Sequence, residues 1–393
     1  MVGAGDGDMP GGAASGGDGD SDFARDGGGG GGGGGDGDVA GNGDGDVTGD
    51  GDGDVAGDGD GDVAGDGDGD GDGGSRKALT IQGSQVPSAQ SDFPLLVRIT
   101  DAELQASADP SGLDIHFADL DGTTPLPFER ESYDSATGTL VAWVKLNLTG
   151  ADQVVYLYYG DGETSEKATP AGVWSNAYQY VWHLNTDPSG SNVDGTGHGG
   201  DATGVNMEPG DLVGAVIGNG VTFDGSNERL TYTNGLTGSG PSTLSAWVDQ
   251  STDGDNNCII SFGTPGSNQV RYLFSTHDST STIRVGFNPN SVNTDDGIEG
   301  MGWKHVTWVW SAGNTEVFVD GASAYGPVAH PDANTSGTGG RIGANVLDNV
   351  FLDGTLDEVR VSTAARSADW IATEYSNQRV AATFITVGAE ESP

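Results

Sequence analysis

The 393-residue chain has few basic residues and a single cysteine. Its 15 Lys and Arg side chains are set against 59 Asp and Glu, which gives a formal net charge of −44. So negative a surface repels phosphate groups, and the longest basic run is Arg76-Lys77, so we expect no nucleic-acid partner. The lone Cys258 excludes an internal disulfide and a cysteine-rich zinc site.

Long apolar runs and nucleophile motifs are also missing. No stretch approaches the ~20 consecutive apolar residues of a membrane helix, so we expect no membrane span. The Gly-x-Ser-x-Gly motif of serine hydrolases does not occur. Cys258 opens an apolar strand pattern, where a free cysteine is normally a small buried side chain, so we expect it to be inert.

The acidity extends over the whole chain and is dominated by aspartate. Asp outnumbers Glu by 46 to 13, and Arg outnumbers Lys by 11 to 4. Residues 76–393 alone hold 39 acidic and 14 basic side chains, a charge of −25. In about 1 M salt the Debye length falls to ~3 Å, which screens such self-repulsion. We interpret the composition as that of an extreme halophile.

Residues 1–75 have the composition of a tail without a core. They hold 33 of the 71 glycines and 20 aspartates, with nine consecutive glycines at 27–35 and an imperfect eight-residue repeat, GDGDVAGD. One Val per repeat cannot offset the entropy of ordering glycine-rich backbone, so we expect disorder. An ordered calcium repeat is the alternative, but the segment has no Glu for an EF-hand, and a calcium β-roll repeats every nine residues.

The first twenty residues have neither the basic start nor the apolar core of a secretory signal. For an exported protein we therefore expect that the true start lies upstream, that the chain is a processed fragment, or that export takes another route.

From residue 76 the sequence consists of short alternating apolar runs between turn residues, a pattern typical of β-strands. The runs lie at 93–100, 113–119, 139–148, 153–160, 178–184, 218–225, 228–233, 242–250, 258–263, 270–276, 282–288, 303–311, 315–321, 339–345, 351–362 and 382–388. Few helical patterns separate them, so the fold class is all-β, built of antiparallel sandwiches. One helix is expected after Ser367, whose side chain can cap SADWIATEYSN.

Six blocks in order resemble the laminin-G-like, concanavalin A-like jelly-roll family. They are VWHL, GNGVTFDG, STLSAWV, GWKHVTWVWSAGNTEVFVDG, RIGAN and FLDGTLDEVRVSTAARSADWI. The resemblance covers 174–371 and implies a jelly-roll sandwich. FPLLVRIT, DIHFADLDGTTPLPFE and VYLYYG in residues 76–168 resemble a small uncharacterised β-domain of prokaryotic surface proteins, and the closing TFITVGAEE resembles that family's ending. We therefore expect four parts: the tail 1–75, a small β-sandwich 76–168, the jelly roll 174–371, and a helix end with a closing strand 372–393.

The sequence offers little for catalysis. Glycoside hydrolysis needs two carboxylates facing one cleft. The best pair is Asp357-Glu358, and strand alternation predicts that these neighbours point to opposite faces. The Glu-x-Asp-x-x-Glu motif of catalytic jelly rolls is absent. We expect that the protein is not an enzyme, and that the strand histidines His183 and His305 are satisfied structural residues.

Calcium is the one ion for which the sequence makes a case, because the resemblance implies a structural ion at a sheet rim. The candidate ligands are Asp194, Asp224 and Asp357, although with 46 aspartates a surface Asp is expected almost anywhere. Sugar rings stack on exposed aromatic side chains, and Trp303 and Tyr325 lie nearest to loops. The remaining strand tryptophans are expected in the core.

Two classes of function remain, together with a structural one. The first is a non-catalytic binding or adhesion protein of the cell surface or extracellular space, whose jelly roll recognises a glycan or a surface protein. The second is a secreted glycoside hydrolase or its accessory carbohydrate-binding module. The third is a structural envelope protein. The sequence leaves the ligand, the anchoring mechanism and the oligomeric state open.

Overall fold

The computed structural model describes residues 74–251, 257–264, 270–276, 282–287, 290–330, 334–337 and 339–393. These belong to one structural unit, 68–393. The tail predicted over 1–75 lies outside the described residues except for its last two positions. The all-β prediction is confirmed, since antiparallel sheets hold 49% of the described residues and helices only 11%.

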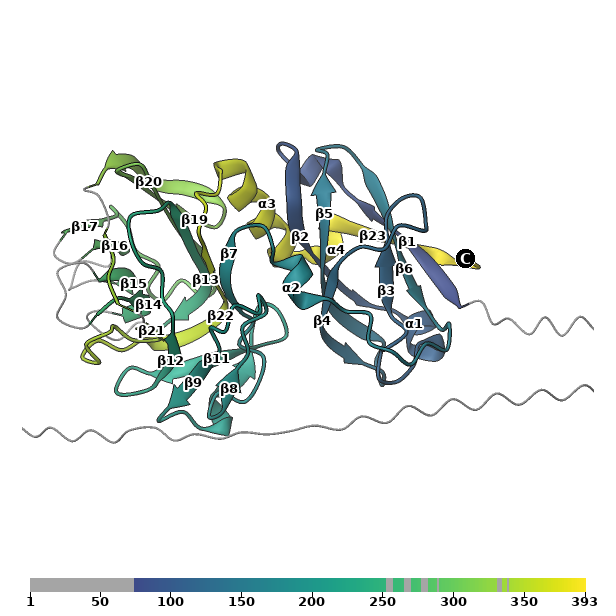
Figure 1. Cartoon of the computed structure of the whole chain (residues 1–393), viewed down its shortest axis with the longest axis horizontal. Coiled ribbons are helices and arrows are strands. Elements are labelled where there is room, and N and C mark those ends of the chain that lie inside the picture. Colours follow the sequence, from purple (N-terminus) through teal and green to yellow (C-terminus); the bar gives the residue numbers. More distant parts are fainter. Residues whose placement is uncertain are drawn as a thin grey trace, which may run out of the picture. The chain divides into compact units, whose positions relative to one another are not determined.

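Two sheets form the first sandwich (Figure 1). One has the order β23 (Ile385–Glu391), β1 (Ser75–Ile81), β6 (Gln153–Tyr159) and β3 (His116–Ala118). The other has the order β2 (Gln90–Thr100), β5 (Thr139–Leu148) and β4 (Phe128–Asp134). Their inner faces share one apolar core, which includes Phe117, Phe128 and Trp143.

The C-terminal segment completes this first sandwich. Strand β23 pairs antiparallel with β1, with Ile385 opposite Ile81 and Val387 opposite Leu79. Figure 1 shows the yellow end of the chain beside the purple strand β1. The strand predicted over 382–388 begins later than expected, because residues up to Phe384 form the short helix α4 (Ala381–Phe384).

The second sandwich consists of two eight-stranded sheets. The first sheet has the order β10 (Leu212–Gly214), β11 (Asn219–Asp224), β22 (Asp353–Ser362), β13 (Ser242–Gln250), β18 (Lys304–Ser311), β19 (Asn314–Val319) and β20 (Ala322–Ala329), with β7 (Tyr178–Trp182) on β22. The second has the order β17 (Asn290–Asn293), β16 (Arg284–Phe287), β15 (Arg271–Thr276), β14 (Asn257–Phe262), β21 (Gly339–Ile342), β12 (Arg229–Thr233), β9 (Ala202–Val205) and β8 (Ser191–Asn192).

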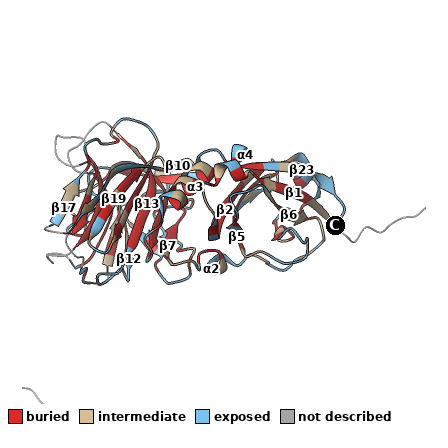
Figure 2. Ribbon diagram, turned by 90° about the horizontal axis from the view of Figure 1, so that it is seen from above, coloured by how far each residue is buried: buried red, intermediate tan, exposed pale blue. Residues whose placement is uncertain are grey.

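Strand alternation places the core of this sandwich between its two sheets. Val306, Trp308 and Trp310 of β18 all lie in the core between the two sheets. In Figure 2 strands β2, β5 and β13 are mostly red, the colour of buried residues, whereas β23 is mostly tan and pale blue. A tight hairpin turn at Asp320 and Gly321 joins β19 to β20, and both residues have positive φ, 51° and 77°.

Helix α3 (Ala368–Arg379) follows β22, and the Ser367 hydroxyl caps it by accepting from Trp370 N–H. The side chain of Asn377 accepts from Leu96 N–H at 2.7 Å and donates to Leu96 C=O at 3.1 Å. These bonds satisfy the backbone groups of Leu96 at the free edge of β2. The other helical segments are short: η1 (Gly83–Gln85), α1 (Ala102–Ser107), α2 (Pro170–Val173) and η2 (Pro209–Asp211). Within the described ranges, no helix combines the length and the apolar character that crossing a membrane requires.

Candidate functional site

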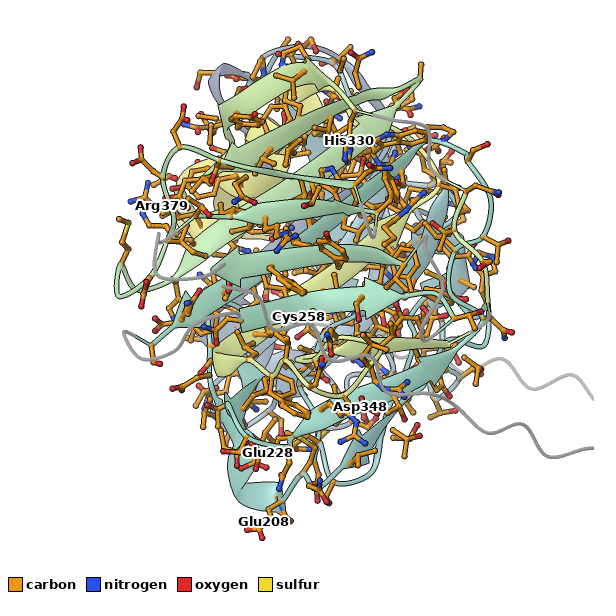
Figure 3. All side chains as sticks on the ribbon, turned by 90° about the vertical axis from the view of Figure 1, so that its left-hand side faces the viewer. Glu208, Glu228, Cys258, His330, Asp348 and Arg379 are labelled. Carbon is orange, nitrogen blue, oxygen red and sulfur yellow. The ribbon has the colours of Figure 1, made fainter. Side chains whose placement is uncertain are left out.

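A small cluster of aromatic side chains, Tyr272 and Phe274, lies on the outer face of the second sheet of the second sandwich, where the two residues are 8% and 7% exposed. Leu273 of β15 points into the core between the sheets, so alternation turns Tyr272 and Phe274 outward. Outside the core these two rings join a separate apolar group with Cys258 and Val346. Figure 3 looks onto this side of the sandwich, with Cys258 near the middle and Asp348 lower down.

These rings line a pocket of about 170 Å³. We call it the Tyr272 pocket; its walls are Val270, Tyr272, Phe274, Arg284, Asn345, Val346 and Leu347. The rings of Tyr272 and Phe274 stack at 4.8 Å, and the Arg284 guanidinium lies 5.8 Å from the Tyr272 ring centroid. Arg284 Nε donates to Oγ of Ser291 at 3.0 Å, and Leu347 is 48% exposed.

The Tyr272 pocket departs from the charge of the rest of the chain. No carboxylate is among its lining residues, and Arg284 supplies the one charge there. Cys258, on the adjacent strand, is fully buried, and burial raises the pKa of its thiol well above its ordinary value. The thiol therefore stays protonated, in keeping with the inert role that the sequence suggests.

A second site, which is polar, surrounds His183, the residue that directly follows β7. Its Nδ1 lies 2.6 Å from Oε1 of Glu358 and 3.6 Å from Oε2 of Glu131, and its Nε2 lies 3.3 Å from Oε2 of Glu129. We call these four residues the His183 cluster. Its side chains are nearly buried, with exposed fractions of 7% for His183, 13% for Glu129, 2% for Glu131 and 1% for Glu358.

Local irregularities of the backbone bring the cluster together. The ladder between β4 and β5 shifts register between Arg130 and Ser132, which makes a bulge at Glu131. The ladder between β13 and β22 shifts in the same way at Glu358, whose φ is 52°. The residue after His183, Leu184, also has a positive φ of 58°. Bulges of this kind re-aim a side chain relative to its strand.

The bulge at Glu358 corrects the alternation predicted for Asp357 and Glu358. Leu356 and Val359 both point into the core between the sheets, so the two acidic residues between them lie on the same outer side. Both are essentially buried there, and the charge of Glu358 acts on Asp357. The sequence argument failed because it assumed an uninterrupted ladder.

Neighbouring donors hold the carboxylates of the cluster in place. Trp143 Nε1 donates to Oε2 of Glu131 at 2.8 Å, and Trp174 Nε1 donates to Oε2 of Glu129 at 2.5 Å. Asn185 Nδ2 donates to Oε1 of Glu131 at 3.1 Å. These bonds fix both glutamates of β4 beside the imidazole.

The charges of the cluster depend on one another. Burial raises the pKa of Glu131 to about 7, although the nearby His183 opposes the shift. Burial alone would lower the pKa of His183, but Glu358, Glu129 and Glu131 outweigh it and raise that pKa well above its ordinary value. Burial and the charge of Glu358 raise the pKa of Asp357 well above its ordinary value. The cluster thus holds more acidic groups than its cations neutralise.

The position of His183 limits what the cluster can do as an acid and base pair. A glycosidase places the scissile bond between two carboxylates. Here the imidazole stands between Glu131 and Glu358, at 3.6 and 2.6 Å from their oxygens. The space that a sugar would need between these two carboxylates is therefore filled by the imidazole.

Two family models match parts of the described chain. Residues 224–372 match the concanavalin A-like lectin/glucanases superfamily, and residues 111–192 match a domain of unknown function, DUF2341. The second sandwich carries a concanavalin A-like domain. The preceding DUF2341 match reaches across β4 to His183, so the His183 cluster draws Glu129, Glu131 and His183 from that segment and Glu358 from the concanavalin A-like segment.

Several solved structures resemble the described fold at low identity. Domain 4 of an extracellular family GH43 arabinanase from Geobacillus stearothermophilus, in complex with arabinotriose, is 19% identical, with a TM-score of 0.42 and coverage of 51% of this chain and 98% of that one. Trypanosoma rangeli sialidase in complex with the inhibitor DANA is 14% identical, with a TM-score of 0.38 and coverage of 60% and 42%. The receptor-binding domain of botulinum neurotoxin D is 14% identical, with a TM-score of 0.39 and coverage of 53% and 54%.

This chain therefore spans about half or less of the sialidase and toxin chains. No curated protein matches the chain in sequence.

The three aspartates proposed as calcium ligands lie in different settings. The buried carboxylate of Asp194 accepts from Val181 N–H, from Thr196 and from Gly200 N–H. The carboxylate of Asp224 accepts from two backbone N–H groups in the turn after β11. Oδ2 of Asp357 accepts from the N–H of Ile217 at 2.8 Å. Over the described ranges these three carboxylates share no hydrogen-bond partner, and the calcium assignment stays a prediction.

The two aromatic residues proposed as a sugar platform lie outside the Tyr272 pocket. Trp303 precedes β18 and is partly buried, and Tyr325 of β20 packs partly buried against the core of the concanavalin A-like domain. Neither is among the residues that line the pocket. Two signals in the sequence could have pointed elsewhere: the alternating pair Tyr272-x-Phe274 on one strand, and the alternating pair Glu129-x-Glu131 on another.

Proposed function

We propose that this protein is a non-catalytic binding protein of the cell surface or extracellular space, and that its concanavalin A-like domain recognises a sugar unit in the Tyr272 pocket. The observation that supports this is the composition of the pocket wall: two stacked aromatic rings, an aliphatic floor, one guanidinium and no carboxylate. Sugar sites combine an apolar surface for the ring face with a few donors for its hydroxyls.

The size and charge of the pocket narrow the proposed ligand. About 170 Å³ is smaller than the roughly 300–1,000 Å³ of typical drug-sized sites, so a single sugar unit is a better fit than a long chain segment. Arg284 favours a carboxylate or sulfate substituent on that unit, since a guanidinium can donate two hydrogen bonds to two oxygens of one anionic group. An acidic sugar is therefore the proposed class.

A second candidate function is glycoside hydrolysis. Its best carboxylates lie in the His183 cluster, where burial raises the pKa of Glu131 to about 7, a value suited to a general acid. The imidazole between Glu131 and Glu358 argues against it. We therefore propose binding without turnover.

A glycan array in molar salt tests the proposal. The full-length chain and its Tyr272→Ala variant are applied to neutral, uronic acid and sulfated glycans. The expected result is a set of acidic glycans that bind the wild type and not the variant. Equal binding by both proteins, or binding to no glycan, would overturn the proposal that the Tyr272 pocket binds a sugar unit. Reducing ends released from any bound polysaccharide would overturn the non-catalytic assignment.

A further inference from the structure

We propose that the His183 cluster is a site for a divalent transition-metal ion such as Zn²⁺, held by Glu131, His183 and Glu358. This goes beyond glycan binding and rests on different residues. One ligand atom of each of the three side chains lies within 4.8 Å of the other two. They come from three separate elements: β4, the end of β7, and β22.

The donor atoms suit an ion that accepts nitrogen as well as oxygen. Zn²⁺ binds histidine nitrogen and carboxylate oxygen, whereas Ca²⁺ prefers an all-oxygen shell. Nδ1 of His183 faces both Glu131 and Glu358, at 3.6 and 2.6 Å. The imidazole therefore supplies a nitrogen at the centre of the group.

The remaining contacts match those of a histidine that ligates a metal. Such a histidine almost always gives its other ring nitrogen to a carboxylate or carbonyl group. Nε2 of His183 lies 3.3 Å from Glu129, which Trp174 holds in place. The oxygen of Glu358 that faces away from His183 accepts from Arg360 at 2.7 Å. Each ligand is thus oriented by a group behind it.

Unpartnered polar atoms beside the cluster give an independent indication of a ligand. A cavity of about 140 Å³ is lined by Glu129, Glu131 and His183, and also by Asn192. Asn192 is 2% exposed, and both polar atoms of its amide lack a hydrogen-bond partner in the described part of the chain. Oδ1 of Asp357, at 0% exposure, is in the same condition. Buried polar groups are normally paired, so these atoms indicate water or an ion.

The charge of the cluster favours a cation. Glu129, Glu131 and Glu358 surround one imidazole, and Arg360 is shared between Glu358 and Glu374. Buried carboxylates that outnumber their cationic partners are costly unless a positive ion joins them. Because Glu131 belongs to the first sandwich and Glu358 to the second, a bound ion would also tie the two sandwiches together.

The test is zinc binding by the full-length chain in molar salt after removal of metal with a chelator. The expected result is one zinc per chain by elemental analysis, and a melting temperature raised by about 5 °C at free zinc near 100 times Kd. Glu131→Gln, which preserves the shape of the side chain, should weaken zinc binding at least tenfold. Co²⁺ should give a visible absorption band that Glu131→Gln removes.

A matched control separates this site from adventitious binding to an acidic protein. Glu374→Gln removes a carboxylate as buried as the ligands, which pairs with Arg360 and does not contact His183, and this variant should bind zinc like the wild type. His183→Gln should lose zinc binding, and Glu131→Gln decides the matter if that variant does not fold. If the wild type retains no zinc, or if Glu131→Gln and the wild type bind zinc with equal affinity, the His183 cluster is not a zinc site. A Ca²⁺ response that needs both Glu131 and His183 would overturn the choice of ion.

Discussion

Nη2 of Arg360 lies 2.7 Å from Oε2 of Glu358 in the interior of the protein, where both side chains are almost fully buried. Nη1 of the same guanidinium lies 2.7 Å from Oε1 of Glu374 on α3. The guanidinium also lies over the ring of Trp143, 4.4 Å from its centroid. One arginine thus joins the concanavalin A-like sheet, the helix that follows it and a tryptophan of the first sandwich.

Arg360→Met should destabilise the protein by about 3–5 kcal/mol, because it leaves Glu374 buried without its cation and Glu358 with His183 alone. The free energy of unfolding in denaturant, at constant molar salt, measures this. Lys304→Met is the control, since the pair of Lys304 with Asp320 is partly exposed and should contribute less than about 1 kcal/mol. Equal losses in the two variants would contradict the role of Arg360.

Arg271→Met should have the opposite effect, although Arg271 is as deeply buried. Its guanidinium lies among aromatic rings, 5.0 Å from the Phe287 centroid, and within the described residues no carboxylate pairs with it. Burial lowers its pKa to about 10. An apolar side chain of similar length should leave the free energy of unfolding unchanged or raise it by up to about 2 kcal/mol. A loss above about 2 kcal/mol would contradict this interpretation.

These two arginines show which features cannot be predicted from the sequence: contacts between residues that are far apart in the chain. Alternating apolar residues and turn signals were enough to predict most strands and the capped helix α3, because those patterns act over a few residues. They were also enough to place Trp308 and Trp310 in the core. The partners of Arg360 and Arg271 depend on residues far away in the chain, which a single sequence does not bring together.

The two candidate sites were missed for related reasons. In β15 every residue from Tyr272 to Phe274 is apolar or aromatic, so alternation alone could not tell the inner face from the outer one. The His183 cluster needed the bulges at Glu131 and Glu358, and bulges interrupt the period on which a strand prediction rests. Both features follow from pairing with a neighbouring strand.

The stability of the first sandwich should decline at acid pH through Asp101. Burial alone would raise the pKa of Asp101, but hydrogen bonds from Lys77 and from the backbone of α1 outweigh it and hold that pKa below its ordinary value. A carboxyl group with a lowered folded-state pKa stabilises the fold above its unfolded-state pKa of about 3.9. That contribution is lost as pH falls through the folded-state value.

Asp101→Asn keeps a side chain that can cap α1 and removes the charge that Lys77 faces at 2.6 Å. At pH 7 we expect a loss of roughly 1 kcal/mol in the free energy of unfolding, because Lys77 is only 3% exposed and keeps Glu103 as a second partner. The difference from wild type should shrink below about pH 4. A difference that stays constant from pH 7 to pH 3 would show that the charge is not responsible.

The composition predicts that folding depends on salt. Residues 76–393 carry 39 acidic and 14 basic side chains, and a charge of −25 is tolerable when the Debye length is ~3 Å, as in about 1 M salt. Circular dichroism of the full-length chain should show loss of β-structure as KCl is diluted from molar to millimolar concentration. Equal thermal stability at both ends of that range would remove the halophilic interpretation.

The dissociation constant of an acidic glycan, measured by calorimetry in molar salt, tests the binding function most directly. The account predicts that Tyr272→Ala and Arg284→Met each weaken binding at least tenfold, about 1.4 kcal/mol, because each removes a wall of the pocket. Tyr156→Ala is the matched control, since Tyr156 also lies under an arginine, Arg76, but belongs to the first sandwich. Unchanged affinity in both pocket variants, or an equal loss of affinity in Tyr156→Ala, would contradict glycan binding in the Tyr272 pocket.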